Sequence, residues 1–260
     1  MLLAINANNT NVKFAIYDGE RPLGDWRIRT ESGRTADEYV VWLSQLMTLA
    51  GLKLSDITSS IIATVVPQAL FNLRTLCERH LRTRPIVVGE PGVSLGVEVL
   101  MDMPVHEVGA DRLANAVGGH VLFGRALIIV DFGTATTFDV IDGKGSYVGG
   151  VIAPGINLSL EALHMATAKL PRIAVAAPKH AIGKDTLGAM QSGVYWGYVG
   201  LIEGLVTRIR AEFGAELMVV ATGGLAPLFA KATPVIERHE PEITMRGLVE
   251  IHRRNQSPRS

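Results

Sequence analysis

Polar and apolar residues alternate in two stretches of the chain that resemble each other. Residues 2–19 read LLAINANNTNVKFAIYDG, and residues 127–143 read LIIVDFGTATTFDVIDG. In each, an apolar run leads into a short polar turn, and an alternating run then ends at Asp-Gly. Alternation with a period of two is typical of β-strands, so both stretches are predicted to be hairpins.

The two predicted hairpins match along most of their length. Residues 14–19 align with 138–143 without a gap, whereas the turns align with one residue of slippage. In this alignment Asn6 corresponds to Asp131. Two related hairpins about 125 residues apart indicate a duplicated domain with a ligand between the halves.

The rest of the pattern alternates strands with helices. Further strands are predicted at residues 22–30, 59–66, 85–88, 146–155 and 216–221, and helices at 35–52, 70–81, 108–122, 158–168, 184–213 and 245–254. This alternation predicts an α/β fold with mixed sheets. No low-complexity linker interrupts the chain, so we place the domain boundary before the second hairpin, giving an N-terminal domain 1–115 and a C-terminal domain 116–260, whose final helix is able to pack back on the first domain.

The longest predicted helix contains a row of glycines about one turn apart: Gly193, Gly197, Gly200 and Gly204. Glycine lowers helix stability, so such a row suggests close packing against another helix. The pattern leaves open whether that helix belongs to the same chain or to a second subunit.

Composition narrows the class of protein. The chain of 260 residues has 25 basic and 25 acidic side chains, which gives no electrostatic case for binding nucleic acid or a membrane surface. Its one cysteine, Cys77, excludes an intramolecular disulfide and a cysteine-based zinc site. We expect no signal peptide and no transmembrane helix, because no long apolar run is present. A cytoplasmic protein fits these features.

The turn after Asp131 offers backbone N–H groups, three hydroxyls and a glycine within residues 132–137. Such N–H groups can bind an anion, and an acidic residue before them can hold a cation that offsets phosphate charge. The alternative is an ordinary tight hairpin in which the threonines satisfy the backbone.

The first turn, residues 8–11, has the same polar capacity. Asn8 is acceptable where a glycine would otherwise lie, because asparagine tolerates positive φ better than most residues. Asn6 keeps one oxygen of a carboxylate but not its charge. Lys13 is predicted either to reach phosphate oxygens or to lie on the outer face of the strand, with neither favoured.

Two further segments allow a functional and a structural interpretation. In GADR, residues 109–112, Asp111 can act as a general base beside an anion-binding Arg112, or it can simply complement the helix dipole. The spacing of these residues alone favours the structural interpretation, in which Asp111 complements the helix dipole. Gly223 and Gly224 can admit a nucleotide or form a plain strand-to-helix turn. The seven histidines show no metal-ligand spacing, and no P-loop occurs.

Together these motifs resemble those of type III pantothenate kinase. The shared segments are GADR at 109–112, DFGTATT at 131–137, GGVIAPGI at 149–156, LEALHMATAKLPR at 160–172, IGKDTLGAMQSGVYWGYVGLIEGL at 182–205 and TGG at 222–224. That family belongs to the acetate kinase, sugar kinase, Hsp70 and actin superfamily. The resemblance implies duplicated ribonuclease H-like, or actin-like ATPase, domains with mixed five-stranded sheets and ATP in an interdomain cleft.

The resemblance also implies an activity, ATP-dependent phosphorylation of pantothenate to 4′-phosphopantothenate, the first step towards coenzyme A. Asp111 would be the catalytic base. Pantothenate would contact Gly109, Ala110 and Arg112, with Thr186 supplied by the same or the partner subunit. Members of the family are cytoplasmic homodimers.

On the nucleotide side, the resemblance implies Mg²⁺ with ATP, and a monovalent cation, K⁺ or NH₄⁺, held by Asp131. The implied ATP contacts are Asn6, Asn9, Thr10, Asn11, Lys13, Thr134, Gly223 and Gly224.

The chain departs from the family pattern in two places. The first phosphate motif, Asp-x-Gly-Asn-Thr in the family, reads Asn6-Ala7-Asn8-Asn9-Thr10 here. Many members also have a substrate-contacting tyrosine before GADR, where this chain has the segment 101–104, MDMP. Two alternatives to an active pantothenate kinase therefore remain: a catalytically weak paralogue with a binding or regulatory role, and a kinase for another small hydroxylated acid.

Overall fold

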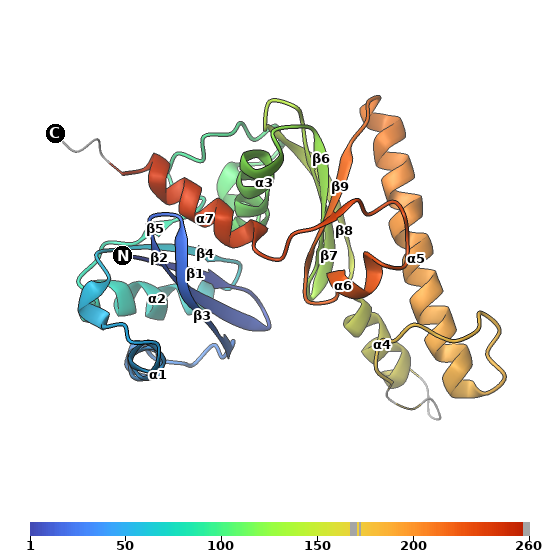
Figure 1. Cartoon of the computed structure of the whole chain (residues 1–260), viewed down its shortest axis with the longest axis horizontal. Coiled ribbons are helices and arrows are strands. Elements are labelled where there is room, and N and C mark those ends of the chain that lie inside the picture. The colour runs from blue at the N-terminus through green and yellow to red at the C-terminus, as the bar shows by residue number, and fades with distance from the viewer. Residues whose placement is uncertain (167–170, 172, 257–260) are drawn as a thin grey trace. The chain divides into compact units, whose positions relative to one another are not determined.

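The computed structural model describes residues 1–166, 171 and 173–256. Its internal contacts divide the chain into two compact units. Unit 1 comprises residues 1–124, 145–147 and 242–260, and unit 2 comprises 125–144 and 148–241. Each unit contains one five-stranded sheet, which Figure 1 shows as a separate set of arrows.

The sheet of unit 1 begins with the first predicted hairpin. Its strands are β1 (Leu2–Ala7), β2 (Asn11–Asp18), β3 (Arg21–Arg29), β4 (Ser59–Thr64) and β5 (Ile86–Val87), in the order β3-β2-β1-β4-β5. The first three strands pair antiparallel, and β4 and β5 join in parallel. The central strand β1 is buried along its whole length, which explains its unbroken apolar sequence.

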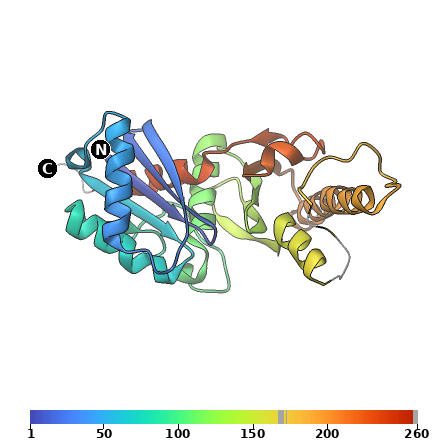
Figure 2. The same cartoon turned by 90° about the horizontal axis from the view of Figure 1, so that it is seen from below.

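The helices of unit 1 are α1 (Ala36–Leu49), α2 (Pro67–Thr75), α3 (Ala110–Phe123) and α7 (Ile243–Arg254), among the residues described. A π-helical turn, Leu76–His80, extends α2. A capping box begins α1, because the Thr35 backbone N–H donates to Glu38 at 2.8 Å and the Glu38 N–H donates back to the Thr35 hydroxyl at 3.3 Å. Figure 2 shows α1 lying along the sheet.

Helix α7 packs closely on α3 although about 120 residues separate them in sequence. A Cβ atom on Gly118 of α3 would overlap the Ile243 carbonyl, and one on Gly247 of α7 would overlap the Ala114 carbonyl. Between the helices, the Thr244 hydroxyl donates to the buried Asn115 side chain at 2.6 Å. The C-terminal helix therefore supports the helix that begins at GADR.

The sheet of unit 2 repeats the plan of the first. Its strands are β6 (Leu127–Phe132), β7 (Ala135–Ile141), β8 (Tyr147–Pro154), β9 (Met218–Gly223) and β10 (Arg238–His239), in the order β10-β9-β6-β7-β8. Counted from β8, this is the order of unit 1, with an antiparallel hairpin β6–β7 and parallel β6–β9 and β9–β10 pairs. The predicted duplication and the mixed five-stranded sheets are thus confirmed.

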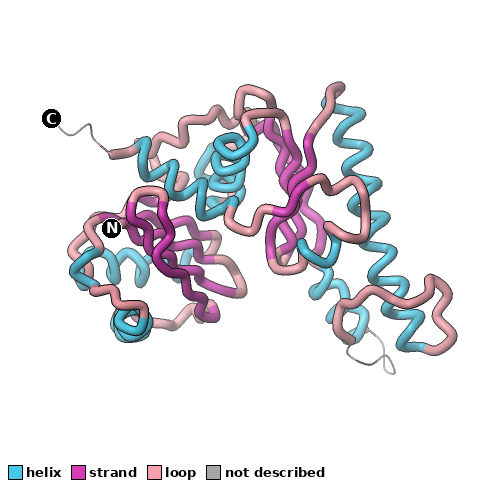
Figure 3. Tube along the Cα trace, viewed as in Figure 1, coloured by secondary structure: helices cyan, strands magenta, loops and turns pink. Residues whose placement is uncertain are grey.

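The helices described in unit 2 are α4 (Ile156–Met165), α5 (Thr186–Phe213) and the short α6 (Ala226–Phe229) (Figure 3). Helix α5 is anchored by Tyr198, whose hydroxyl donates to the Pro154 carbonyl at 2.7 Å and hydrogen-bonds Thr136 at 2.6 Å. Two residues of the helix predicted at 158–168, 167 and 168, lie outside the described residues.

The internal contacts separate the units after Gly124, whereas the predicted boundary at residue 115 falls inside α3. Helix α7, which follows unit 2 in sequence, belongs to unit 1. No helix in the described part of the chain is long and apolar enough to cross a membrane.

Candidate active site

The turn between β6 and β7 places Asp131 one residue before the end of its strand. Asp131 pairs with Thr137 across the hairpin and with Thr222 on β9. The two-residue turn is closed by the Gly133 N–H, which donates to the Ala135 carbonyl at 3.1 Å. A Cβ atom on Gly133 would lie 3.3 Å from that carbonyl, so the glycine permits a tight turn without a positive φ.

The Asp131 carboxylate lies against Gly223 at the end of β9. A Cβ atom on Gly223 would be 2.7 Å from Asp131 Oδ1 and 2.6 Å from the Phe132 carbonyl, and the φ of Gly223 is +90°. Only glycine fits both conditions. The structure therefore places Asp131 beside Gly223. The family resemblance implies that Asp131 binds the monovalent cation and that Gly223 contacts ATP.

The start of α4 braces the same turn. The Gly155 N–H donates to the Thr134 carbonyl at 3.1 Å, and a Cβ atom on Gly155 would overlap that carbonyl. Thr134 is therefore held at the tip of the hairpin by its backbone.

The first turn, between β1 and β2, is held by the end of β3. The Asn8 N–H donates to the Asn11 carbonyl at 3.0 Å, and the Thr30 hydroxyl donates to the Asn8 carbonyl at 2.6 Å. Asn8 does not adopt a positive φ, so our conformational reason for asparagine at this position is wrong. Its place is set by hydrogen bonds instead.

Two amide oxygens in this turn are buried without a protein partner. Asn6 Oδ1 and Asn8 Oδ1 make no hydrogen bond with any of the described residues. Asn6 as a whole is only 8% exposed. A buried oxygen without a donor is unfavourable. Both atoms are therefore suited to accept a hydrogen bond from a ligand or water, or to contact a cation.

In this structure Lys13 pairs with two carboxylates. Its Nζ lies 2.6 and 2.8 Å from the two carboxylate oxygens of Glu242 and 3.2 Å from Asp25. The side chain is only 10% exposed. Its charge is therefore balanced within unit 1 by two carboxylates.

The GADR segment forms the N-terminus of α3, with Gly109 as N-cap. Asp111 Oδ1 accepts a hydrogen bond from the Arg112 N–H at 2.8 Å. Burial raises the pKa of Asp111, and the Arg112 N–H partly opposes that rise. A Cβ atom on Gly109 would lie 2.7 Å from Asp111 Oδ1, so the glycine leaves room for the carboxylate.

Arg112 lies over an aromatic ring that sequence reasoning missed. Its Cζ is 5.6 Å from the centroid of Tyr147, which is fully buried at the start of β8. This distance permits a cation–π interaction. No pattern around Tyr147 indicated the contact, because 35 residues separate the two side chains in sequence.

Thr186 is the first residue of α5, a different element from those that hold the other candidates. It is exposed, and Asp185 caps the helix by accepting the Gly188 N–H at 2.7 Å. Along the same helix, Cβ atoms on Gly193, Gly197 and Gly200 would meet nothing within 4 Å among the described residues. The glycine row is therefore not packed against another helix of this chain's described part.

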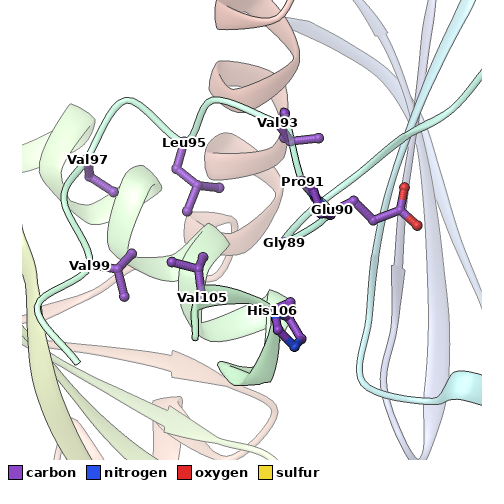
Figure 4. Close-up of a pocket in the computed structure, with 10 residues that line it drawn as sticks. Gly89, Glu90, Pro91, Val93, Leu95, Val97, Val99, Val105 and His106 are labelled. Carbon is purple, nitrogen blue, oxygen red and sulfur yellow. The ribbon is translucent and has the colours of Figure 1, made fainter. Parts of the chain in front are cut away.

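A cavity of about 350 Å³ lies in unit 1 just ahead of GADR. Figure 4 shows its walls, which consist mainly of apolar side chains with Glu90 and His106 at the edge. The lining residues are Gly89, Glu90, Pro91, Gly92, Val93, Leu95, Val97, Val99, Val105 and His106. None of the predicted site residues is among them.

The candidate residues divide between the two units. Unit 1 contains Asn6, Asn9, Thr10, Asn11, Lys13, Gly109, Ala110, Asp111 and Arg112, and unit 2 contains Asp131, Thr134, Thr186, Gly223 and Gly224. No group of three or more histidine, cysteine or acidic side chains forms a metal cluster within the described ranges.

Comparison with known proteins gives one consistent result. The model of the family described as type III pantothenate kinase matches residues 2–208. A type III pantothenate kinase of Paramagnetospirillum magneticum is 60% identical over 258 residues, covering 99% of this chain and 99% of that protein.

Solved structures extend the comparison to the fold. A candidate Baf family transcriptional activator from Campylobacter jejuni aligns with a TM-score of 0.60 at 18% identity, covering 97% of this chain and 98% of that one. A candidate 2-dehydro-3-deoxygalactonokinase from Sinorhizobium meliloti gives 0.60 at 13% identity, covering 98% and 99%. At these identities the likeness shows the fold alone, which is the duplicated actin-like and sugar-kinase architecture.

Proposed function

The chain belongs to the type III pantothenate kinase family, and from this premise we propose that it transfers the γ-phosphoryl group of ATP to the hydroxyl of pantothenate. The product is 4′-phosphopantothenate, the first intermediate towards coenzyme A. Phosphoryl transfer depends mainly on positioning and charge neutralisation, which two polar turns and a buried base can provide.

The observation that carries the proposal is the environment of Asp111. Burial raises the pKa of its carboxyl group, which makes the carboxylate a better proton acceptor for an alcohol. Arg112 supplies a cation one residue away, suited to the carboxylate of an acidic substrate. We propose that Gly109 and Ala110 contact the substrate through their backbone.

For the nucleotide, we propose contacts to phosphate from Asn9, Thr10, Asn11 and Thr134, with Gly223 and Gly224 beside the adenosine. Lys13 is less suited to this role, because Glu242 and Asp25 already balance its charge.

The first turn fits a magnesium ion that arrives with ATP. Asn6 Oδ1 and Asn8 Oδ1 are buried acceptors that lack a partner among the residues described, and oxygen is the ligand that Mg²⁺ prefers. Their neutrality favours contact through water molecules of the ion. When bound, Mg²⁺ would neutralise phosphate charge, while the two amides would orient its water shell.

We propose that the second turn holds the monovalent cation, K⁺ or NH₄⁺, through Asp131. This carboxylate occupies the place of Asn6 in the duplicated sheet and lies beside the backbone of Gly223. A single carboxylate with surrounding carbonyl oxygens suits an ion of low charge density.

We also propose a homodimer formed through α5. Its glycines and the neighbouring Trp196, which is 45% exposed, form a face that nothing in the described part of the chain covers. Small residues permit close helix packing, and a partner helix there would explain why glycine is placed where it weakens the helix. Thr186 begins the same helix and would join the substrate site from either subunit.

The proposed enzyme acts in the cytoplasm on a small molecule, without nucleic acid or membrane. A regulatory role in place of catalysis is not favoured, because the closely similar relatives carry the kinase name and the likeness to a transcriptional activator is confined to the fold.

The test is ATP-dependent phosphorylation of pantothenate in the presence of Mg²⁺ and K⁺, with Asp111→Asn as the matched variant. We expect turnover by the wild type and a loss of about 100- to 10,000-fold in the variant. The variant should stay folded, since asparagine removes a charge whose burial is unfavourable.

Other outcomes are equally informative. A variant that keeps more than about a tenth of the wild-type rate excludes Asp111 as the base. If the wild type shows no detectable turnover and the Asn6→Asp variant does, the natural chain is not an active kinase. Preference for another hydroxylated acid would redirect the substrate assignment.

A further inference from the structure

Arg112 lies over the ring of Tyr147. The guanidinium carbon lies 5.6 Å from the ring centroid, within the range of cation–π attraction. Tyr147 is fully buried, so water does not compete for the ring. An arginine over a dry ring face has a defined plane, whereas an arginine in water samples many orientations.

The backbone that carries the ring is held by neighbouring segments. The Tyr147 N–H donates to the Glu98 carbonyl at 2.8 Å, and its own carbonyl accepts from the Leu100 N–H at 2.8 Å. Two residues earlier, Gly145 has a φ of +91°, and a Cβ atom there would lie 2.6 Å from the His120 ring of α3. The segment is thus fixed both to the strand-like stretch before GADR and to the helix that follows it.

We propose that Tyr147 is a positioning residue for Arg112. Its ring face holds the guanidinium plane so that the N–H edge is presented to the carboxylate of the acidic substrate. The inference deepens the proposed function and rests on it, because it assumes that Arg112 binds the substrate anion.

The mechanism is a reduction of the entropy lost on binding. A guanidinium that is already oriented forms two parallel hydrogen bonds to a carboxylate with little further ordering. Tyr147 should therefore affect the affinity for the acid substrate, while the chemical step at Asp111 and the binding of ATP should change little.

Unit 1 contains a matched pair that serves as a control. Arg34 lies over Tyr39 with its Cζ 5.7 Å from the ring centroid, and Tyr39 is also fully buried. Neither residue is a candidate site residue. A substitution at Tyr39 thus changes a similar interaction without touching the proposed substrate site.

The experiment replaces each tyrosine in turn by phenylalanine and by phenylalanines with one, two and three fluorine atoms. Fluorine withdraws electrons from the ring face and weakens cation–π attraction while the shape of the ring is nearly kept. For Tyr147 we expect the KM for pantothenate to rise with each fluorine, by about fivefold over the series. We expect kcat and the KM for ATP to stay within about twofold.

The same series at Tyr39 should leave every kinetic constant unchanged. A flat series at Tyr147, or an equal trend at Tyr39, overturns the inference, because a purely structural ring would respond to shape and not to electron density. If phenylalanine is not tolerated at position 147, fluorotyrosines, which retain the hydroxyl, provide the series instead.

The experiment distinguishes failure of the proposed function from failure of the positioning role of Tyr147. A wild-type protein that leaves pantothenate unphosphorylated overturns the proposed function, and the substrate part of this inference with it. Normal turnover of pantothenate with a flat fluorine series overturns the positioning role of Tyr147 alone.

Discussion

The two turns of the duplicated sheets occupy equivalent places but carry different charge. Asn6 and Asp131 are each the fifth residue of a six-residue central strand, and they face Lys13 and Thr137 across their hairpins. In the first turn a neutral amide faces a lysine that is balanced by two carboxylates. In the second, a carboxylate faces a hydroxyl.

The difference shows how a repeated fold can separate two tasks. The neutral first turn has buried oxygens without a donor among the described residues, suited to the water shell of an incoming metal–nucleotide complex. The second turn has a fixed negative charge, suited to a cation bound by the protein itself. Four substitutions test this difference, because each removes or transfers a residue by which one hairpin differs from the other.

Asp131→Asn makes the second turn resemble the first and should have the largest effect. Loss of the carboxylate would remove the proposed site of the cation that offsets phosphate charge, so we expect turnover to fall about 100-fold, with activation by K⁺ lost. Steady-state rates over a K⁺ titration measure both. Asp18→Asn, at the exposed end of β2, is the control and should behave as wild type. Undiminished K⁺ activation in Asp131→Asn would place the cation elsewhere.

Lys13→Met removes the charge that distinguishes the first hairpin from the second. Because Glu242 and Asp25 then lose their shared cation, we expect the free energy of unfolding to fall by about 2 kcal/mol, measured by urea denaturation. The KM for ATP should change less than about threefold. A rise of more than tenfold without loss of stability would instead support a contact between Lys13 and phosphate.

Asn6→Asp gives the first turn the carboxylate of the second. We expect the affinity of the nucleotide-free protein for Mn²⁺ to rise about tenfold, because a charged oxygen at this buried position is a stronger ligand than an amide. Electron paramagnetic resonance of free Mn²⁺ measures this without an activity assay. Asn9→Asp, in the exposed part of the same turn, is the matched control. Equal affinities for all three proteins would exclude a metal position at Asn6.

Asn8→Gly copies the glycine of the second turn and should have the smallest effect. Asn8 does not have a positive φ, so glycine relieves no strain and only increases the freedom of the unfolded chain. We expect a loss of about 0.5 kcal/mol in the free energy of unfolding. A gain in stability would show that the buried amide is more costly than the added backbone freedom.

Much of the fold could be predicted because its signals are local. Both hairpins, their equivalence and the capping box at Thr35 follow from alternation and cap chemistry over a few residues. The ends of elements are harder to predict than their existence. Helix α2 begins at Pro67 because proline favours the first turn of a helix, whereas the pattern predicted a start at residue 70. The family motifs indicated Asp111 and Asp131 as candidate site residues.

The site could be predicted only as a set of residues and not as a set of contacts. Lys13 was identified as a candidate, but its pairing with Glu242 joins positions 229 residues apart. Tyr147 was not identified at all, since nothing local marks an aromatic ring that lies under a distant arginine.

The sequence by itself determined the duplicated α/β architecture, the family and the residues that differ between the two turns. These are properties of period, motif and residue type, and each is written within a short stretch. Only the tertiary structure decided which charges are balanced, which oxygens lack a donor and which glycines have no room for a side chain. Those depend on atoms that folding brings together from distant positions, and burial then fixes their energies by removing water.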